Sequence, residues 1–186
     1  MAEAKKSASM ARLVLVLFAV TAIVALLLGF VDYITRDKIA ANIKAKTDAA
    51  MSAVLEASNY TALESFTDNS GLVNSIYIAT DGSDTFLGYV AEVSPGGFGG
   101  TINMVVGVDA YGAVTGVSIV KMTETSGLGA NAANTSFRDQ FVGKSGKLAV
   151  NKDGGDIVAL TGATVTSRAV TEGVNAVLAA VVGNAA

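Results

Sequence analysis

Four hydroxyl side chains stand together in the segment Leu160-Thr161-Gly162-Ala163-Thr164-Val165-Thr166-Ser167, just before an apolar helical pattern. The first N–H groups of a helix lack intrahelical partners and carry a partial positive charge, which favours a phosphate. Gly162 lets the backbone approach an anion closely, and Arg168 adds a positive charge one turn further on. The segment is therefore suited to hold a phosphate, and the Thr164 hydroxyl could be esterified by one. The same pattern also describes an ordinary helix start, in which Ser or Thr caps the first turn.

A second motif, Thr123-Glu124-Thr125-Ser126-Gly127-Leu128-Gly129, lies upstream of the first. Its two glycines permit positive φ angles and close approach of the backbone, and Leu128 between them can lie flat against an apolar ring. Glu124 and Thr125 offer acceptors and a hydroxyl donor at the edge of such a ring. Taken alone, the motif is more typical of a structural glycine loop. Together with the first motif, it favours a cofactor site.

The elements that must position these motifs follow from the apolar pattern. β-Branched and aromatic residues predict strands over 73–79, 85–93, 101–109 and 113–121. The turn Ala110-Tyr111-Gly112 makes the last two an antiparallel hairpin. A short helix is predicted over 131–142, short strands over 147–150 and 156–160, and a final helix over 167–182. The predicted fold class is α+β, a mostly antiparallel sheet with helices packed against it.

The run from Leu13 to Val31 contains no charged residue. At about 1.5 Å per helical residue it spans roughly 28 Å, close to the hydrocarbon thickness of a bilayer. No cleavage pattern follows it, so we expect an uncleaved transmembrane helix. The positive-inside count is nearly even, since three basic residues precede the run (Lys5, Lys6 and Arg12) and four follow soon after it (Arg36, Lys38, Lys44 and Lys46). Because long C-terminal domains translocate largely regardless of charge, a short basic N-terminus on the cytoplasmic side remains favoured. The predicted layout is a cytoplasmic N-terminus over 1–12, a transmembrane helix over 13–31, a juxtamembrane helical segment over 32–71 and an extracytoplasmic domain over 72–186.

The chain contains no Cys and no His. This absence excludes the thiolate and imidazole ligands that iron–sulfur clusters and structural zinc sites use, so no metal site is expected. It also excludes nucleophiles that depend on a His base. Any redox function therefore requires an organic cofactor. The formal net charge of −3 and the absence of a basic patch argue against a nucleic-acid partner.

The order of these features resembles the FMN-binding domain of the Rnf complex's G subunit, to which the C subunit of the sodium-pumping NADH:quinone reductase is related. The shared features are a glycine loop, a hairpin, Glu-Thr-x-Gly-Leu-Gly, a Phe-containing helix and Thr-Gly-Ala-Thr-x-Thr-Ser. The resemblance covers roughly residues 72–182, and the single N-terminal anchor fits it. Three positions depart from the family: Met122, Ser126 and Val158 stand where it commonly has His, Pro and Asp.

The resemblance implies that FMN is attached covalently, through its phosphate, to Thr164. It implies that the isoalloxazine ring lies near the loop that contains Glu124, Thr125, Gly127, Leu128 and Gly129. It implies that the phosphate is surrounded by Gly162, Ala163, Thr166 and Ser167, with Thr161 also in the cofactor site. No bond-making catalytic residue is expected within the chain.

The resemblance further implies an electron-transfer subunit of a membrane-bound, ion-translocating ferredoxin:NAD oxidoreductase complex in the cytoplasmic membrane. The expected partners are the other membrane and redox subunits of that complex and, during maturation, a flavin-attaching transferase. Two alternatives remain: a C-type subunit of a sodium-translocating NADH:quinone reductase, and a membrane-anchored module that binds a phosphate ligand or flavin without a covalent bond. A pilin is disfavoured, because Arg12 precedes the apolar run and the run contains no acid.

Overall fold

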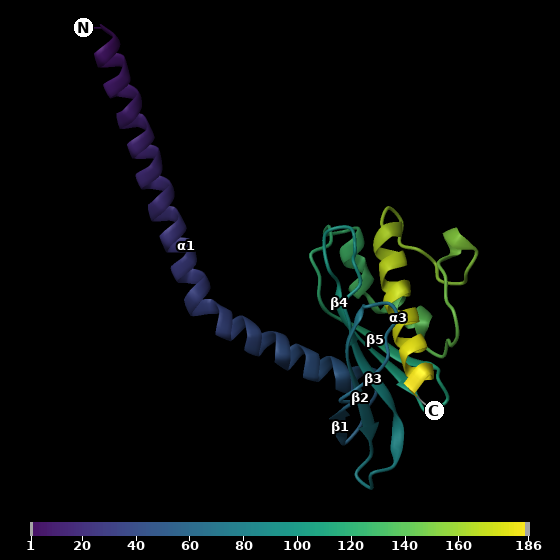
Figure 1. Cartoon of the computed structure of the whole chain (residues 1–186). Helices are drawn as coiled ribbons and strands as arrows, with labels where there is room; N and C mark the ends of the chain where they lie inside the picture. Colours follow the sequence, from purple (N-terminus) through teal and green to yellow (C-terminus); the bar gives the residue numbers. More distant parts are fainter. Residues whose placement is uncertain (1, 185–186) are drawn as a thin grey trace. The chain divides into compact units, whose positions relative to one another are not determined.

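The structure, a computed structural model, describes the backbone of residues 2–184 and the side chains of residues 10 and 12–181. The chain divides into two compact units, Met1–Lys44 and Ala45–Ala186. The first unit is helical and belongs to α1, which runs over Ala2–Val54 (Figure 1). Lys5 and Lys6, on which the predicted orientation partly rests, lie outside the residues whose side chains are described.

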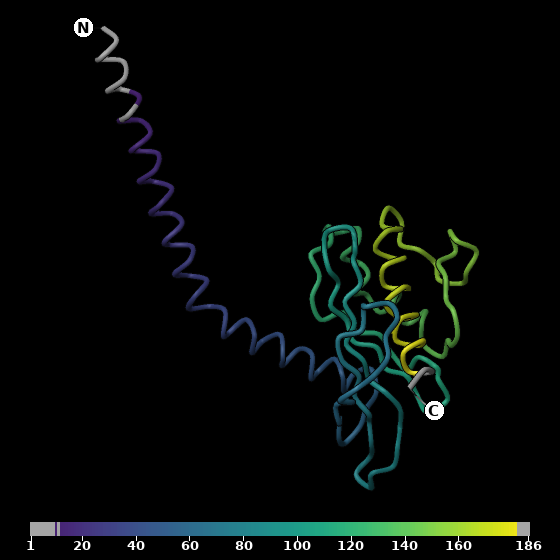
Figure 2. The backbone as a smooth tube through the Cα atoms, viewed as in Figure 1, coloured from purple at the N-terminus to yellow at the C-terminus, as the bar shows by residue number. Residues whose placement is uncertain are grey.

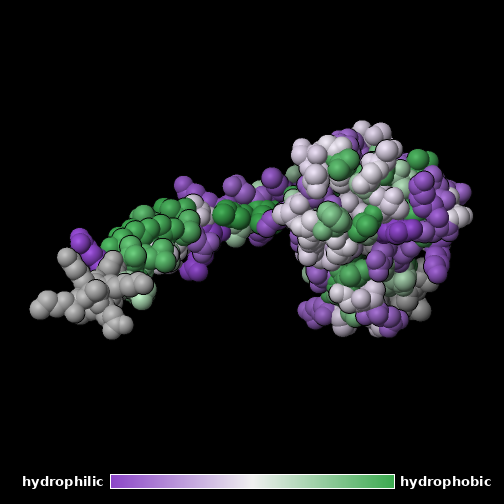
Figure 3. Space-filling model, turned by 90° about the horizontal axis from the view of Figure 1, so that it is seen from above, coloured by the Kyte–Doolittle hydropathy of each residue, from purple (hydrophilic) through white to green (hydrophobic). Residues whose placement is uncertain are grey.

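One helix in the described part of the chain is long and apolar enough to cross a membrane. It lies within Arg12–Val54, and its most apolar 18-residue window has a mean hydropathy of 3.0. The side chains of that window are not buried within the protein, and they form the green stretch of the helix in Figure 3. Exposed leucines, valines and isoleucines of this density need an apolar environment, which agrees with the predicted transmembrane helix.

The second unit is built on a five-stranded antiparallel sheet with the order β1-β2-β3-β4-β5. The strands are β1 (Asn59–Ala62), β2 (Val73–Thr80), β3 (Phe86–Val93), β4 (Asn103–Asp109) and β5 (Val114–Lys121). β2 to β5 occupy the four segments that alternation predicts. The α+β fold class is therefore confirmed.

The connection between β5 and the C-terminal helix differs from the prediction. Short helical turns replace the helix expected over 131–142: η1 (Gly129–Ala133), α2 (Thr135–Arg138) and η2 (Asp139–Phe141). The two short strands expected over 147–150 and 156–160 reduce to a single parallel bridge, Val150 to Ile157, around η3 (Asn151–Asp153). α3 spans Thr164–Asn184 and so begins three residues before the predicted start. Thr164 therefore lies in the first helical turn and not in the preceding loop.

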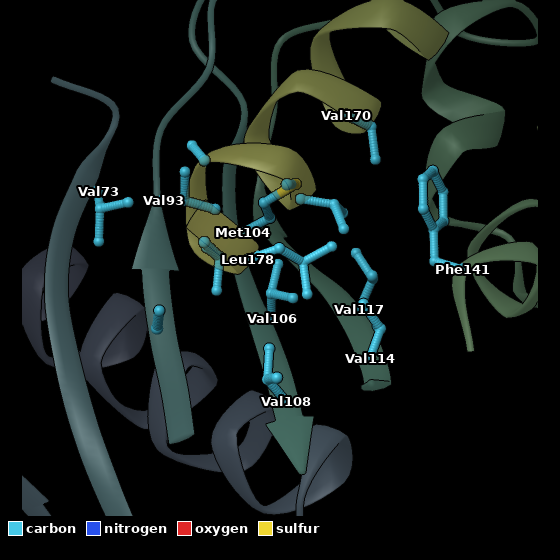
Figure 4. Close-up of a cluster of buried hydrophobic side chains, with 14 of the residues drawn as sticks. Val73, Val93, Met104, Val106, Val108, Val114, Val117, Phe141, Val170 and Leu178 are labelled. Atoms are coloured by element: carbon cyan, nitrogen blue, oxygen red, sulfur yellow. The ribbon is translucent and has the colours of Figure 1, made fainter. Parts of the chain in front are cut away.

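The main core lies between the sheet and α3. Met104, Val106 and Val108 point from one face of β4 toward this core, and α3 places Val170 and Leu178 above them (Figure 4). Phe137 and Phe141, which the sequence places one turn apart, form an edge-to-face pair with ring centroids 5.6 Å apart. Both rings are fully buried, so these turns fix the connection to the core.

The other face of the sheet receives the last turns of α1. Ala50, Met51 and Val54 pack there against buried residues of the sheet, among them Val90 and Val105. Two paired glycines, Gly107 and Gly116, leave room for the end of the helix, since a Cβ atom on Gly116 would lie 3.0 Å from the Val54 Cα atom. The Thr115 hydroxyl donates a 2.6 Å hydrogen bond to the Val54 carbonyl. β4 is therefore buried on both faces, although alternation predicts one buried face.

The juxtamembrane segment predicted to be helical over 32–71 is helical only to Val54. Beyond that residue the chain turns and adds β1 to the edge of the sheet, with Tyr60 paired to Ala79. The Tyr60 hydroxyl donates to the Leu55 carbonyl, which the helix leaves unpaired. The last turns of α1 are not solvated, because the sheet buries Ala50 and Val54.

Replacing Gly107 by Ala is expected to destabilise the second unit by about 1–3 kcal/mol, because overpacking forces a shift of the neighbours. The new Cβ atom would lie 2.7 Å from the Val54 carbonyl oxygen. Thermal unfolding of the full chain in detergent measures the effect. Gly96→Ala is the matched control, because the position has open space around it. Equal midpoints for the two variants contradict this account of the contact.

Candidate functional site

The two sequence motifs meet at the end of the sheet where α3 begins. Figure 2 shows the β3–β4 loop and the segment after β5 near that end of α3. A cavity of about 420 Å³ opens there. Its lining residues come from three segments: Phe98, Glu124, Thr125, Leu128, Gly129, Gly162, Ala163, Thr164, Val165 and Thr166. A volume of this order is in the range of small-molecule sites.

The Thr164 side chain occupies the first helical position of α3 and is partly exposed on the cavity wall. Gly162 precedes it with a φ of +75°, which closes the turn into the helix. The first N–H groups of α3 have no carbonyl partner four residues earlier within the helix. Thr164 and the start of α3 therefore both border the cavity.

The Ser167 hydroxyl is turned inward. It accepts a 2.9 Å hydrogen bond from the Leu160 N–H and donates a 3.0 Å bond to the Ala163 carbonyl, and the residue is completely buried. It thus fixes the turn that precedes α3. The structure does not bring Ser167 to the cavity, although the sequence suggests a place around the phosphate.

The Glu124 carboxylate joins α3 to the β3–β4 loop through two hydrogen bonds. One oxygen accepts a 2.7 Å hydrogen bond from the Thr166 hydroxyl in α3, and the other accepts a 2.9 Å bond from the Gly99 N–H in the β3–β4 loop. Gly129 passes close beside the first bond: a Cβ atom there would lie 2.7 Å from the Thr166 Oγ1 atom. Of the two glycines in this motif, Gly127 has a positive φ, of +76°, whereas Gly129 serves close packing.

Arg168 does not supply a free positive charge to the cavity. Its guanidinium forms two hydrogen bonds to the Asp153 carboxylate, at 2.7 Å and 2.6 Å, and it does not line the cavity. The hydrogen bonds from Arg168 hold the pKa of Asp153 below its ordinary value. This exposed pair fastens the loop around η3 to the first turns of α3.

Eight of the eleven predicted site residues line the cavity, and Gly127, Thr161 and Ser167 do not. The sequence analysis does not predict two of the lining residues, Phe98 and Val165. Both are large apolar side chains with high exposure, 74% and 49%. Phe98 stands alone among four glycines, and an aromatic residue in an otherwise glycine-only turn is a signal that could have revealed it.

Comparison with known families agrees with this geometry. Residues 97–179 match the FMN-binding domain, and residues 1–54 match the RnfG N-terminal region. The chain is 33% identical to the G subunit of the Na(+)-translocating ferredoxin:NAD(+) oxidoreductase complex of Acetobacterium woodii. The match runs over 183 residues and covers 88% of this chain and 87% of that protein. The chain belongs to the family of Rnf G subunits.

Other Rnf G subunits match over a shorter part. The G subunit of the proton-translocating ferredoxin:NAD(+) oxidoreductase complex of Clostridium ljungdahlii is 47% identical over 102 residues, 53% of this chain and 55% of that protein. Among solved structures, the C subunit of the Na(+)-translocating NADH-quinone reductase from Parabacteroides distasonis aligns with a TM-score of 0.47 and 24% identity, over 56% of this chain and 59% of that one.

Within this Rnf-type site, Ser167→Ala is expected to destabilise the domain by about 1–3 kcal/mol, because the Leu160 N–H loses its acceptor. Hydrogen exchange should accelerate in the turn over 160–163. Thr161→Ala is the control, since its side chain is exposed and outside the cavity lining. Unchanged exchange in the Ser167 variant would show that the hydroxyl does not hold the turn.

Proposed function

We propose that this chain is the FMN-carrying electron-transfer subunit of a membrane-bound, ion-translocating ferredoxin:NAD oxidoreductase complex, with the FMN phosphate esterified to Thr164. Family membership supports the role in such a complex, and the match over 97–179 supports FMN as the cofactor. When bound, FMN supplies one- and two-electron chemistry, which the chain's own side chains do not provide. The residues of the chain bind, orient and shield the group.

One observation carries the covalent attachment: the described residues that line the cavity include no Lys or Arg. The phosphate of free FMN bears about −1.5 to −2 charges at pH 7, by analogy with other phosphate monoesters. Among the described lining residues, that charge would face the Glu124 carboxylate with no cation to oppose it, only neutral donors such as the first N–H groups of α3 and the Thr125 hydroxyl. A phosphodiester carries a single charge, and its covalent bond makes occupancy independent of the free flavin concentration. The site therefore favours an ester at Thr164 over reversible binding of free FMN.

The cavity lining supplies groups for both parts of the cofactor. Thr164 at the start of α3 offers the attachment point for the phosphate, and Leu128 and Val165 offer apolar surface for a ring. Gly162 approaches Leu128 closely, since a Cβ atom on Gly162 would lie 3.2 Å from the Leu128 Cδ2 atom. The attachment point and the ring-facing leucine are thus held next to each other.

The domain is proposed to face away from the cytoplasm, with α1 anchored in the cytoplasmic membrane. The apolar stretch of α1 and membership in a family of membrane-complex subunits support the membrane association. In that compartment free FMN is scarce, which gives a covalent link its advantage. A flavin-attaching transferase is the partner required during maturation. The other partners are the membrane and redox subunits of the complex.

Thr164→Val is expected to abolish the covalent flavin while leaving the fold intact, because Thr164 is partly exposed and its hydroxyl is the only group removed. The chain is co-expressed with a flavin-attaching transferase, denatured and desalted, and its mass and visible absorption are measured. Thr61→Val is the control, because it removes an exposed threonine hydroxyl on β1, outside the cavity lining, and should keep the full flavin adduct. If denaturation releases flavin from the wild-type chain, the flavin is bound reversibly and the proposed ester is wrong.

The orientation can be tested with a single cysteine, because the natural chain contains none. Tyr111→Cys places a thiol at a side chain that is 96% exposed. A membrane-impermeant maleimide should label it in right-side-out vesicles and not in sealed inside-out vesicles. Labelling only in the inside-out vesicles would reverse the proposed topology.

A further inference from the structure

Phe98 is an exposed aromatic ring at the mouth of the cavity. Its side chain is 74% exposed, although it belongs to the lining. The ring stands in the loop Gly96-Gly97-Phe98-Gly99-Gly100, which joins β3 to β4. Two other large apolar side chains on the same cavity, Leu128 and Val165, are also exposed. Apolar surface of this kind, gathered on one cavity, is suited to cover a flat apolar ligand.

The loop that carries Phe98 is held in place. Its turn is closed by a 2.8 Å hydrogen bond from the Gly97 N–H to the Gly100 carbonyl, and the neighbouring Ile102 N–H donates to the Pro95 carbonyl. Both backbone groups of Gly99 are also bonded to the segment after β5. The Gly99 N–H donates to Glu124, and the Gly99 carbonyl accepts from the Thr123 hydroxyl at 2.7 Å. Phe98 therefore has a fixed backbone and an unpacked ring.

Glu124 fixes the distance between this loop and α3. Its second carboxylate oxygen accepts from Thr166, two residues after the proposed attachment point. A single side chain thus links the residue next to Phe98 with the helical turn that carries Thr164. If this link were broken, the loop would keep its own turn and its bond to Thr123, but it would lose its connection to α3.

We propose that Phe98 contacts the isoalloxazine ring of the bound flavin and that Glu124 is the positioning residue that holds Phe98 there. The inference rests on the proposed function, because it assigns a contact to the cofactor bound at Thr164. Phe98 and the flavin would meet as two aromatic rings, in an offset-stacked or edge-to-face arrangement. Phe98 then covers one side of the ring, while Glu124 serves the loop and does not bind the phosphate.

The test uses the fact that the chain contains no Trp. Phe98→Trp introduces a single indole, a strong electron donor that quenches flavin emission on contact. Flavin emission of the native holoprotein is divided by its emission after denaturation, which corrects for cofactor content. This ratio should fall about fivefold or more relative to wild type, because the two rings lie within aromatic contact distance. Tyr111→Trp is the matched control, with its side chain 96% exposed and outside the cavity lining, and it should leave the ratio unchanged.

The role of Glu124 is tested in the Phe98→Trp background. Glu124→Ala removes both hydrogen bonds and should restore most of the lost emission. Glu124→Gln should keep the quenching, since its carbonyl can accept from the Gly99 N–H and its amide can donate to the Thr166 hydroxyl. If the Ala variant lacks an unfolding transition, Thr166→Val in the same background decides instead. Restored emission there supports the link between the loop and α3, and persistent quenching overturns it.

The outcomes separate this inference from the proposed function. A wild-type chain that keeps its flavin through denaturation, together with a Phe98→Trp variant that emits like wild type, overturns the ring contact alone. A wild-type chain that binds flavin reversibly overturns the ester. In that case the quenching in the native Phe98→Trp variant still tests the contact between the two rings. A chain that carries no flavin in any form overturns both.

Discussion

The Glu124 carboxylate is the group on which the site depends, because it accepts one hydrogen bond from each of two elements that are distant in the sequence. The Thr166 hydroxyl comes from α3 and the Gly99 N–H from the β3–β4 loop. A carboxylate bonded at both oxygens fixes direction as well as distance, since charge-assisted hydrogen bonds are short and strong. Without it, the Phe98 loop would keep its hydrogen bond to Thr123 but would lose the side chain that joins it to α3. With it, the helix start, the glycine motif and the Phe98 loop form one wall.

The sheet carries this wall on a rigid base because it is covered on both faces. α3 covers one face with a stripe of valines, and the last turns of α1 cover the other through Met51 and Val54. The hydrogen bond from Thr115 to Val54 closes the end of α1 against β5. The segment over 45–54 is therefore an integral part of the second unit.

Much of the sheet could be predicted from the sequence, because β2 to β5 alternate or are rich in β-branched residues. β1 could not, since it has only four residues, of which three are exposed and only Tyr60 is half-buried, and this is too short a pattern to recognise. The expected helix over 131–142 breaks where Asn134 adopts an extended conformation, with a ψ of 143°. The apolar periodicity does not reveal this break, because Phe137 and Phe141 are one turn apart both in a continuous helix and in the short helical turns that replace it.

The site residues, like the secondary structure, could be predicted from the sequence only in part. The motifs predicted the cavity because their side chains have functional chemistry, but residue type did not show which way a side chain points. Ser167 has the chemistry of a phosphate ligand and in fact bonds the turn behind it, and Arg168 has that of a free cation and in fact pairs with Asp153. Direction depends on the helical turn: along the first turn of α3, Thr164 and Thr166 line the cavity, whereas Ser167 is buried beneath it.

The hydrogen bonds that engage Arg168 and Glu124 within the protein have a consequence for the cofactor. With Arg168 bonded to Asp153 and Glu124 bonded within the wall, the described lining offers a phosphate only neutral donors, the N–H groups at the start of α3 and threonine hydroxyls. Such donors orient an anion well but hold a mobile dianion weakly in the presence of a nearby carboxylate. The proposed covalent bond would remove this weakness, because the affinity of the site would no longer determine its occupancy. In that proposal the wall serves the ring, and its exposed apolar side chains supply the surface that covers it.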